Sequence, residues 1–328
     1  MKVMRKISLI VACSCMMLLI FDSKSAFQGA KYGVELCAGS VIPSLFPFLV
    51  LSVFLVSSLN ETDSSAVLLL SDLMGLPQKA SPVLIPAFFG GYPVGAKTVT
   101  DMYYSGIISK QEAERLLAFC NNAGPSFLFG IVSVCFSDRK MILWLWLIHI
   151  MGAFCTALIY SARLSDSDDS GRRMQTKVGQ DSMLSSVKAI GVICGWIILF
   201  RTFLVYLNKW VLWRLPDWFQ VCIVGMLELT NGCGELVRIY DVRVRFIICS
   251  CMLAFGGICV LLQTASVTRG LSLRKYITGK LIHTGFSLAI SSMIMANNGL
   301  MYALIICISA VALLKIKIKG RNKGFYPV

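Results

Sequence analysis

The chain has 328 residues, of which 56% are hydrophobic and only 15% carry a charged side chain. Soluble domains carry about one quarter charged residues, so this composition excludes an ordinary soluble protein. The net charge of +14 does not indicate nucleic-acid binding, because the lysines and arginines lie at the edges of hydrophobic runs. That distribution is typical of membrane proteins, so we expect a lipid bilayer and no nucleic acid as partner.

Hydrophobic runs near the ~20 residues that a helix needs to cross a bilayer recur along the chain. The first resembles a signal peptide, but its apolar part continues past Cys13, which favours an uncleaved first span. We therefore predict an all-α polytopic membrane protein with about eight to ten membrane-embedded segments. The runs are Met4–Phe21, Leu36–Val56, Met141–Ala162, Met183–Leu207, Phe246–Gln263 and Leu281–Leu314.

A hydrophilic stretch over residues 163–182, "RLSDSDDSGRRMQTKVGQDS", divides the chain into membrane halves 1–162 and 183–328, the second with a basic C-terminal tail. The first half has two interrupted apolar segments, "IPAFFGGYPVGAKT" and "AFCNNAGPSFLFGIV". The second has "VGMLELTNGCGEL" and "CMLAFGGICVLLQTAS" at matching places. Such matched interruptions predict two repeats with a transporter's binding site between them.

The first interruption, "FFGGYPVGAKTVTD", breaks an apolar run with Pro93 and with Gly90, Gly91 and Gly95. Proline removes a backbone donor, and glycine permits a tight reversal. Unpaired backbone groups are tolerated in a membrane only around a protein-lined or watery cavity, so a re-entrant hairpin or unwound helix is predicted. Its helix ends would attract an anion, and Lys97 adds a positive charge or serves as a snorkelling anchor.

The second interruption places Asn121 and Asn122 beside the Gly124–Pro125 break, where their amides either bind a solute or join helices. The intervening stretch "ISKQEAERLL" predicts a polar helix at the membrane edge, with Ser109 and Glu112 as a capping box.

In the second half, Glu228 and Glu235 flank "LTNGCG". Glu228, with Thr230, is a candidate for binding a coupling Na⁺ or H⁺, or it is an interfacial glutamate paired with an arginine. For Glu235 we favour pairing with Arg238 or Arg243. The basic residues Arg269, Arg274, Lys275 and Lys280 predict a cytoplasmic loop.

Several other patterns indicate no enzyme and no cofactor. "GGYPVGAKT" approaches a phosphate-binding loop, but Ala96 separates Gly95 from Lys97, and no nucleophile–base arrangement is present. His149 and His283 each stand alone in an apolar run, which favours satisfied interior histidines. The thirteen cysteines are scattered in apolar runs and favour small hydrophobic packing over disulfides or metal binding. Gly191 and Gly195 fit the spacing of a close helix crossing.

The stretches "SVIPSLFPFLVLSVFL", "GGYPVGAKTV", "GIISKQEAERLLAFCNNAGPSFLFGIV" and "LELTNGCGEL" resemble the YlbJ or SpoVV family of sporulation integral membrane proteins, which carry the gate or nucleoside-recognition domain. The resemblance implies a fold similar to concentrative nucleoside transporters, with two inverted-topology repeats that each contain a re-entrant hairpin. It also implies movement of dipicolinic acid from the mother cell across the outer forespore membrane of a spore-forming bacterium.

We therefore expect alternating-access transport of a small organic anion, with dipicolinate as the leading substrate. The protein could also form an oligomer. The alternatives are a nucleoside or nucleobase transporter and a non-transporting scaffold required for spore formation. Phe89, Tyr92 and Phe127 would contact the ring of the solute. The substrate-binding candidates are Gly90, Gly91, Tyr92, Pro93, Gly95, Lys97, Asn121, Asn122, Gly124, Pro125, Asn231 and Gly232, and the ion-coupling candidates are Glu228 and Thr230.

Overall fold

The structure is a computed structural model that describes residues 2–47, 49–51, 65–74, 76, 78–161 and 180–296. Within these ranges every regular element is helical, which confirms the predicted all-α class. Residues 163–179 of the predicted linker lie outside the described ranges, and Gln180–Ser182 already belong to helix α10 (Gln180–Trp210). The basic tail and the last part of the run Leu281–Leu314 also lie outside them.

Four stretches of the described residues are long and apolar enough to cross a membrane. They are Ser23–Leu51, Arg139–Tyr160, Ser186–Trp210 and Val242–Val267. In helix α1 (Lys2–Phe21) the stretch Leu9–Phe21 is a shorter apolar helix, so the predicted first span stays a prediction.

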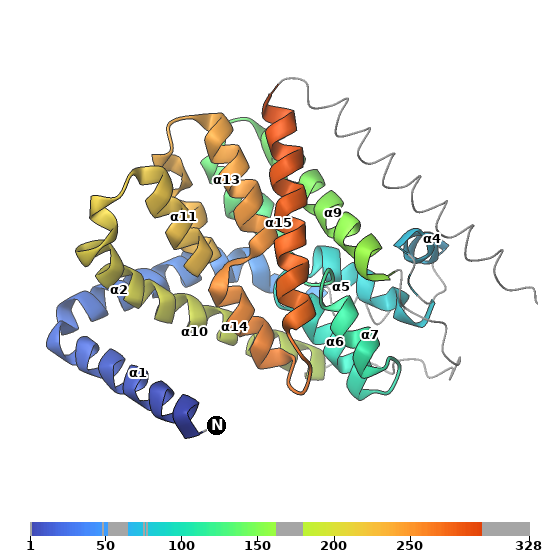
Figure 1. The fold of residues 1–328 in the computed structure, drawn as a ribbon, viewed down its shortest axis with the longest axis horizontal. Helices are drawn as coiled ribbons and strands as arrows, with labels where there is room; N and C mark the ends of the chain where they lie inside the picture. The colour runs from blue at the N-terminus through green and yellow to red at the C-terminus, as the bar shows by residue number, and fades with distance from the viewer. Residues whose placement is uncertain are drawn as a thin grey trace, which may run out of the picture.

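Helix α2 (Ser23–Leu36) packs along α10 through two glycines (Figure 1). A Cβ atom at Gly29 would lie 2.7 Å from Thr202 Cα, and one at Gly33 would lie 2.8 Å from Ile198 Cα. The close helix crossing thus uses this glycine pair. A Cβ atom at Gly191 or Gly195 would meet nothing within 4 Å in the described part of the chain, so the crossing predicted there is not formed.

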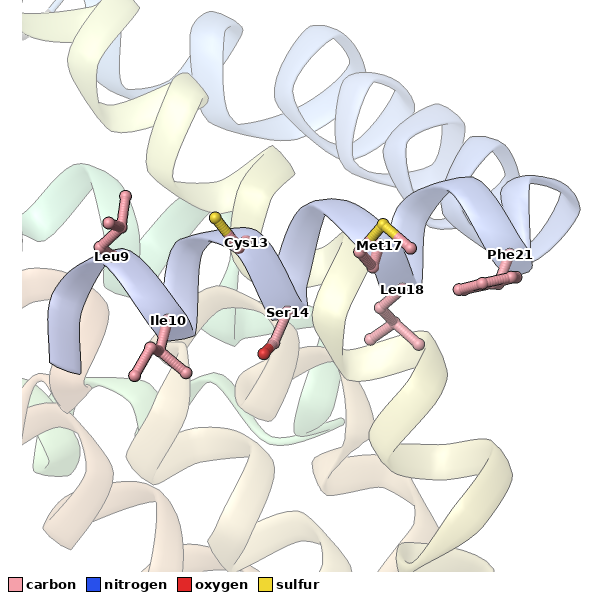
Figure 2. A pocket seen from close by; sticks show the side chains of 7 residues that line it. All are labelled: Leu9, Ile10, Cys13, Ser14, Met17, Leu18 and Phe21. Atoms are coloured by element: carbon pink, nitrogen blue, oxygen red, sulfur yellow. The ribbon is translucent and has the colours of Figure 1, made fainter. Parts of the chain in front are cut away.

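Helix α1 runs beside the rest of the fold and exposes its apolar side chains (Figure 1). Figure 2 shows the seven α1 side chains that line a surface hollow of about 620 Å³. The helix joins α2 at Asp22, which accepts hydrogen bonds from Ser25 N at 3.2 Å and from Lys209 Nζ at 2.7 Å. These contacts fix the corner between α1 and α2 against the end of α10.

The end of α10 and the start of α11 (Asp217–Leu227) carry a group of exposed aromatic side chains. Trp210, Trp213 and Trp218 are each about half exposed or more. Exposed tryptophans beside the charged groups of Arg214 and Lys209 are typical of the membrane–water interface. We therefore expect this corner to lie at one membrane–water interface.

The remaining helices form the body that positions the interruptions. Helix α15 lies against α13 and α9 and crosses the middle of the body (Figure 1). The bounds are α4 Ser65–Met74, α5 Leu84–Phe89, α6 Val94–Tyr104, α7 Lys110–Leu116, α8 Pro125–Gly130, α9 Arg139–Ser161, α12 Leu229–Glu235, α13 Val242–Phe255, α14 Gly257–Val267 and α15 Arg274–Met295.

The start of α7 and the burial of the cysteines agree with the sequence analysis. Ser109 and Glu112 form a capping box at the start of α7, with Ser109 N donating to Glu112 Oε2 at 2.7 Å. Glu112 is buried, and its Oε1 lies 3.2 Å from Lys79 Nζ, so part of the predicted polar helix packs against the rest of the protein. The cysteines of the described residues are free, and most of them are at least partly buried.

Candidate functional site

The helix over residues 84–104 is interrupted between Phe89 and Val94, as the glycines and proline predict. Gly91 has a φ of +74°, which a residue with a Cβ atom rarely adopts. Helix α6 then begins without a side-chain cap. Its first backbone N–H groups therefore have no side-chain acceptor at this end.

The second interruption separates α7 from α8 and lies against the first. A Cβ atom at Gly124 would lie 2.9 Å from Gly91 N, and one at Gly95 would lie 1.7 Å from Cys120 O. Pro125 occupies the first position of α8, where its missing N–H is not needed. The glycines that break these helices are thus also the residues that let the two interruptions touch.

The second half contains two further interruptions that touch each other. Glu228 adopts an extended conformation between α11 and α12, and Gly256 and Gly257 have φ of +83° and +82° between α13 and α14. A Cβ atom at Gly257 would lie 3.0 Å from Gly225 O, and one at Gly232 would lie 2.2 Å from Gly225 Cα. Each half therefore holds a pair of broken helices in direct contact.

Two side chains join the first-half pair to the second-half helices. Tyr92 OH donates to Leu253 O at 2.9 Å, and it lies 3.2 Å from a Cβ atom built on Gly256. Asn121 Nδ2 donates to Thr264 Oγ1 at 2.8 Å. The interruption at Phe89–Val94, the one at Asn121 and the one at Gly256 are thereby brought together inside the protein.

Lys280 lies at this junction, although the sequence placed it in a basic loop. It belongs to α15 and is only 2% exposed. Its Nζ donates to Asn121 O at 2.5 Å and to Tyr92 OH at 3.1 Å. Helix α15 can come this close because Gly279 has no side chain. A Cβ atom at this position would lie 2.2 Å from Ala118 O. The prediction that Lys280 lies in the loop is wrong, because α15 starts at Arg274 and carries Lys280 inward, whereas Arg269 does lie in the connection between α14 and α15.

Several buried polar atoms near the interruptions have no hydrogen-bond partner within the described ranges. Asn121 is fully buried and its Oδ1 is unpaired, as is Asn122 Oδ1, while the Asn122 amide donates to Ala87 O and Phe119 O. The hydroxyl of Ser126 is also buried and unpaired.

His149 and His283, which the sequence predicts to be interior histidines, are both buried and lie in contact with each other. Their ring centroids are 4.7 Å apart, and His283 Nε2 lies 3.0 Å from His149 O. His149 Nε2 accepts from Ala123 N at 3.1 Å, which places the proton of a neutral ring on Nδ1. The pair connects α9 and α15 to the second interruption.

Lys97 does not join the contact between the interruptions. Its Nζ lies 2.7 Å from Asp101 Oδ2, and its side chain is 43% exposed. Phe89 is also exposed and lies edge-on to Trp146, whereas Phe127 is buried in the core. Tyr92 lies at the junction around Lys280, where its hydroxyl donates to Leu253 O and accepts from Lys280 Nζ.

Glu228 is 2% exposed and caps helix α12. Its carboxylate accepts from Thr230 N at 3.0 Å and from the backbone and side-chain amides of Asn231, each at 2.7 Å. It has no arginine partner among the described residues. Glu235 instead pairs with Arg238 at 3.1 Å, as predicted, and lies 3.8 Å from Arg201. No group of three or more metal-binding side chains occurs in the described part of the chain.

Comparison with known proteins supports the membrane assignment. The chain is 27% identical to the sporulation integral membrane protein YlbJ of Bacillus subtilis (strain 168) over 295 residues, which cover 76% of this chain and 72% of that protein. No family model and no solved structure matches the chain. Given this similarity and the four long apolar helices, the chain is an integral membrane protein similar to one named for sporulation.

Proposed function

We propose that this protein is a secondary transporter that moves a small organic anion across a membrane at the junction of its broken helices. The observation that carries the proposal is that interruptions from both halves lie side by side in the protein interior. Exposed backbone groups are costly in hydrocarbon, so four such breaks are retained only where they serve a polar site.

An anion fits this site better than a cation. Helices α6, α8 and α14 each begin at an interruption without a side-chain cap. The N-terminal end of a helix presents positive partial charge, which favours negative solutes. At α12, by contrast, the carboxylate of Glu228 already occupies this position. The cation nearest the junction among the described side chains, Lys280, adds to the same preference.

The arrangement also supports two inverted repeats, each with a re-entrant hairpin, as in concentrative nucleoside transporters. Each half contributes two broken helices that touch each other, and Tyr92 and Asn121 then join the halves. In transporters of this kind, one unit moves against the other around a central site. We propose that the broken helices move together in this way, without covalent chemistry.

Dipicolinate is the substrate that the similarity favours. The relative is named as a sporulation integral membrane protein, which suits a role at the outer forespore membrane of a mother cell. Dipicolinate is a planar aromatic dianion, so it matches helix starts, a buried ammonium group and the rings of Tyr92 and Tyr276.

The proposal is tested by measuring uptake of labelled dipicolinate into liposomes that contain the purified protein, with and without Na⁺ and proton gradients. Saturable uptake above that of empty liposomes supports transport, and dependence on one gradient identifies the coupling ion. Competition by nucleosides would favour a nucleoside carrier instead. Absence of uptake of either solute by folded protein would favour the scaffold role.

A further inference from the structure

We propose that Lys280 is the residue that binds the carboxylate of the transported anion, with the ring of Tyr276 beside it. This inference rests on the proposed transport function and adds to it the group that carries the countercharge. Neither residue was a candidate from the sequence, where Lys280 was assigned to a loop.

The ammonium group of Lys280 has one N–H group left for a ligand. An ammonium group has three donors. Two are used by Asn121 O and Tyr92 OH, at 2.5 and 3.1 Å. Both acceptors are neutral, and no carboxylate lies within 4.0 Å of this nitrogen in the part of the chain that the structure describes. The third donor therefore remains available.

The carboxylates that flank the interruptions are held elsewhere. Asp101 pairs with Lys97 on α6, and Glu228 accepts three hydrogen bonds from Thr230 and Asn231. His283, on the next turn of α15, and His149, on α9, supply no negative charge. A buried ammonium group without a countercharge is destabilising, so such residues in membrane proteins are retained for function. A bound anion would provide the missing charge.

The surroundings of Lys280 suit a flat carboxylate. Its nitrogen lies 4.8 Å from the ring centroid of Tyr92 and 5.8 Å from that of Tyr276. Tyr276 is buried, and its hydroxyl interacts with the side chains of Thr264 and Asn121 on the neighbouring elements. An ammonium group recognises a carboxylate, and the two rings favour an aromatic one.

The test is equilibrium binding to the purified full-length protein in detergent, which does not depend on transport. The probes are dipicolinate and its neutral diamide, which has nearly the same shape. We expect wild-type protein to bind dipicolinate about 30-fold or more tightly than the diamide, because removal of one partner of a buried charge pair has an effect of this size. In Lys280→Gln the two affinities should approach each other through a loss of dipicolinate affinity alone.

The matched control is Lys275→Gln, the same change on the same helix away from the junction, which should keep the wild-type preference. Retention of that preference by Lys280→Gln would overturn the proposal. If Lys280→Gln does not fold, the ratio of the wild-type affinities for dipicolinate and the diamide decides. Equal wild-type affinities for the two probes would also overturn the proposal. If wild-type protein shows the preference but no liposome uptake, the binding role stands and the transport function fails.

Discussion

The closest backbone contact between the first two interruptions is at Gly95, and adding one methyl group there tests whether this contact matters. A Cβ atom at Gly95 would lie 1.7 Å from Cys120 O, whereas real Cβ atoms essentially never approach another atom within 3.0 Å. Gly95→Ala must therefore move α6 away from the second interruption by about 1.3 Å. The obstacle is a backbone carbonyl and not the end of a flexible side chain, so rotation of a side chain cannot relieve the clash.

The expected effect is larger on transport than on stability. Overpacking of this kind destabilises by about 1–3 kcal/mol. Displacement of binding groups by about 1 Å can reduce activity about 100-fold. The assays are thermal unfolding in detergent and dipicolinate uptake into liposomes. Gly191→Ala on α10 is the control, because a methyl group there meets nothing within 4 Å in the described structure. Wild-type uptake and stability in Gly95→Ala would refute the close contact.

Two further substitutions test other parts of the fold, both by thermal unfolding in detergent. Gly33→Ala places a Cβ atom 2.8 Å from Ile198 Cα, so it should destabilise the α2–α10 crossing by about 1–3 kcal/mol, and an unchanged melting temperature would contradict that crossing. Glu228→Ala leaves the buried N–H groups of Thr230 and Asn231 without their acceptor and should destabilise by about 1–3 kcal/mol, whereas Glu228→Gln should lose less because it keeps an acceptor oxygen. Equal losses in the two variants would contradict the capping role.

The interruptions could be predicted from the sequence because their causes are local. Pro93 cannot continue a helix, and Gly91 and Gly256 adopt positive φ, so the residue types themselves mark the breaks. The capping box at Ser109 is equally local. Such features depend on neighbours within a few residues, and those are visible in the chain.

The position of Lys280 could not be predicted in the same way. Charge in a short basic cluster indicates a loop, and only the packing of Gly279 against Ala118 shows that this part of α15 is buried. The contact of His149 with His283, 134 positions apart, likewise depends on tertiary structure. One sequence signal was available: Tyr276, Lys280 and His283 lie at spacings of four and three residues, which places them on one helix face.

The most direct test of the central claim is an experimentally determined structure of the protein with dipicolinate bound. We predict that the ligand lies at the junction of the broken helices, with a carboxylate oxygen within hydrogen-bond distance of Lys280 Nζ and its ring beside Tyr92 or Tyr276. A ligand bound elsewhere, with Lys280 still enclosed by protein groups alone, would contradict the account.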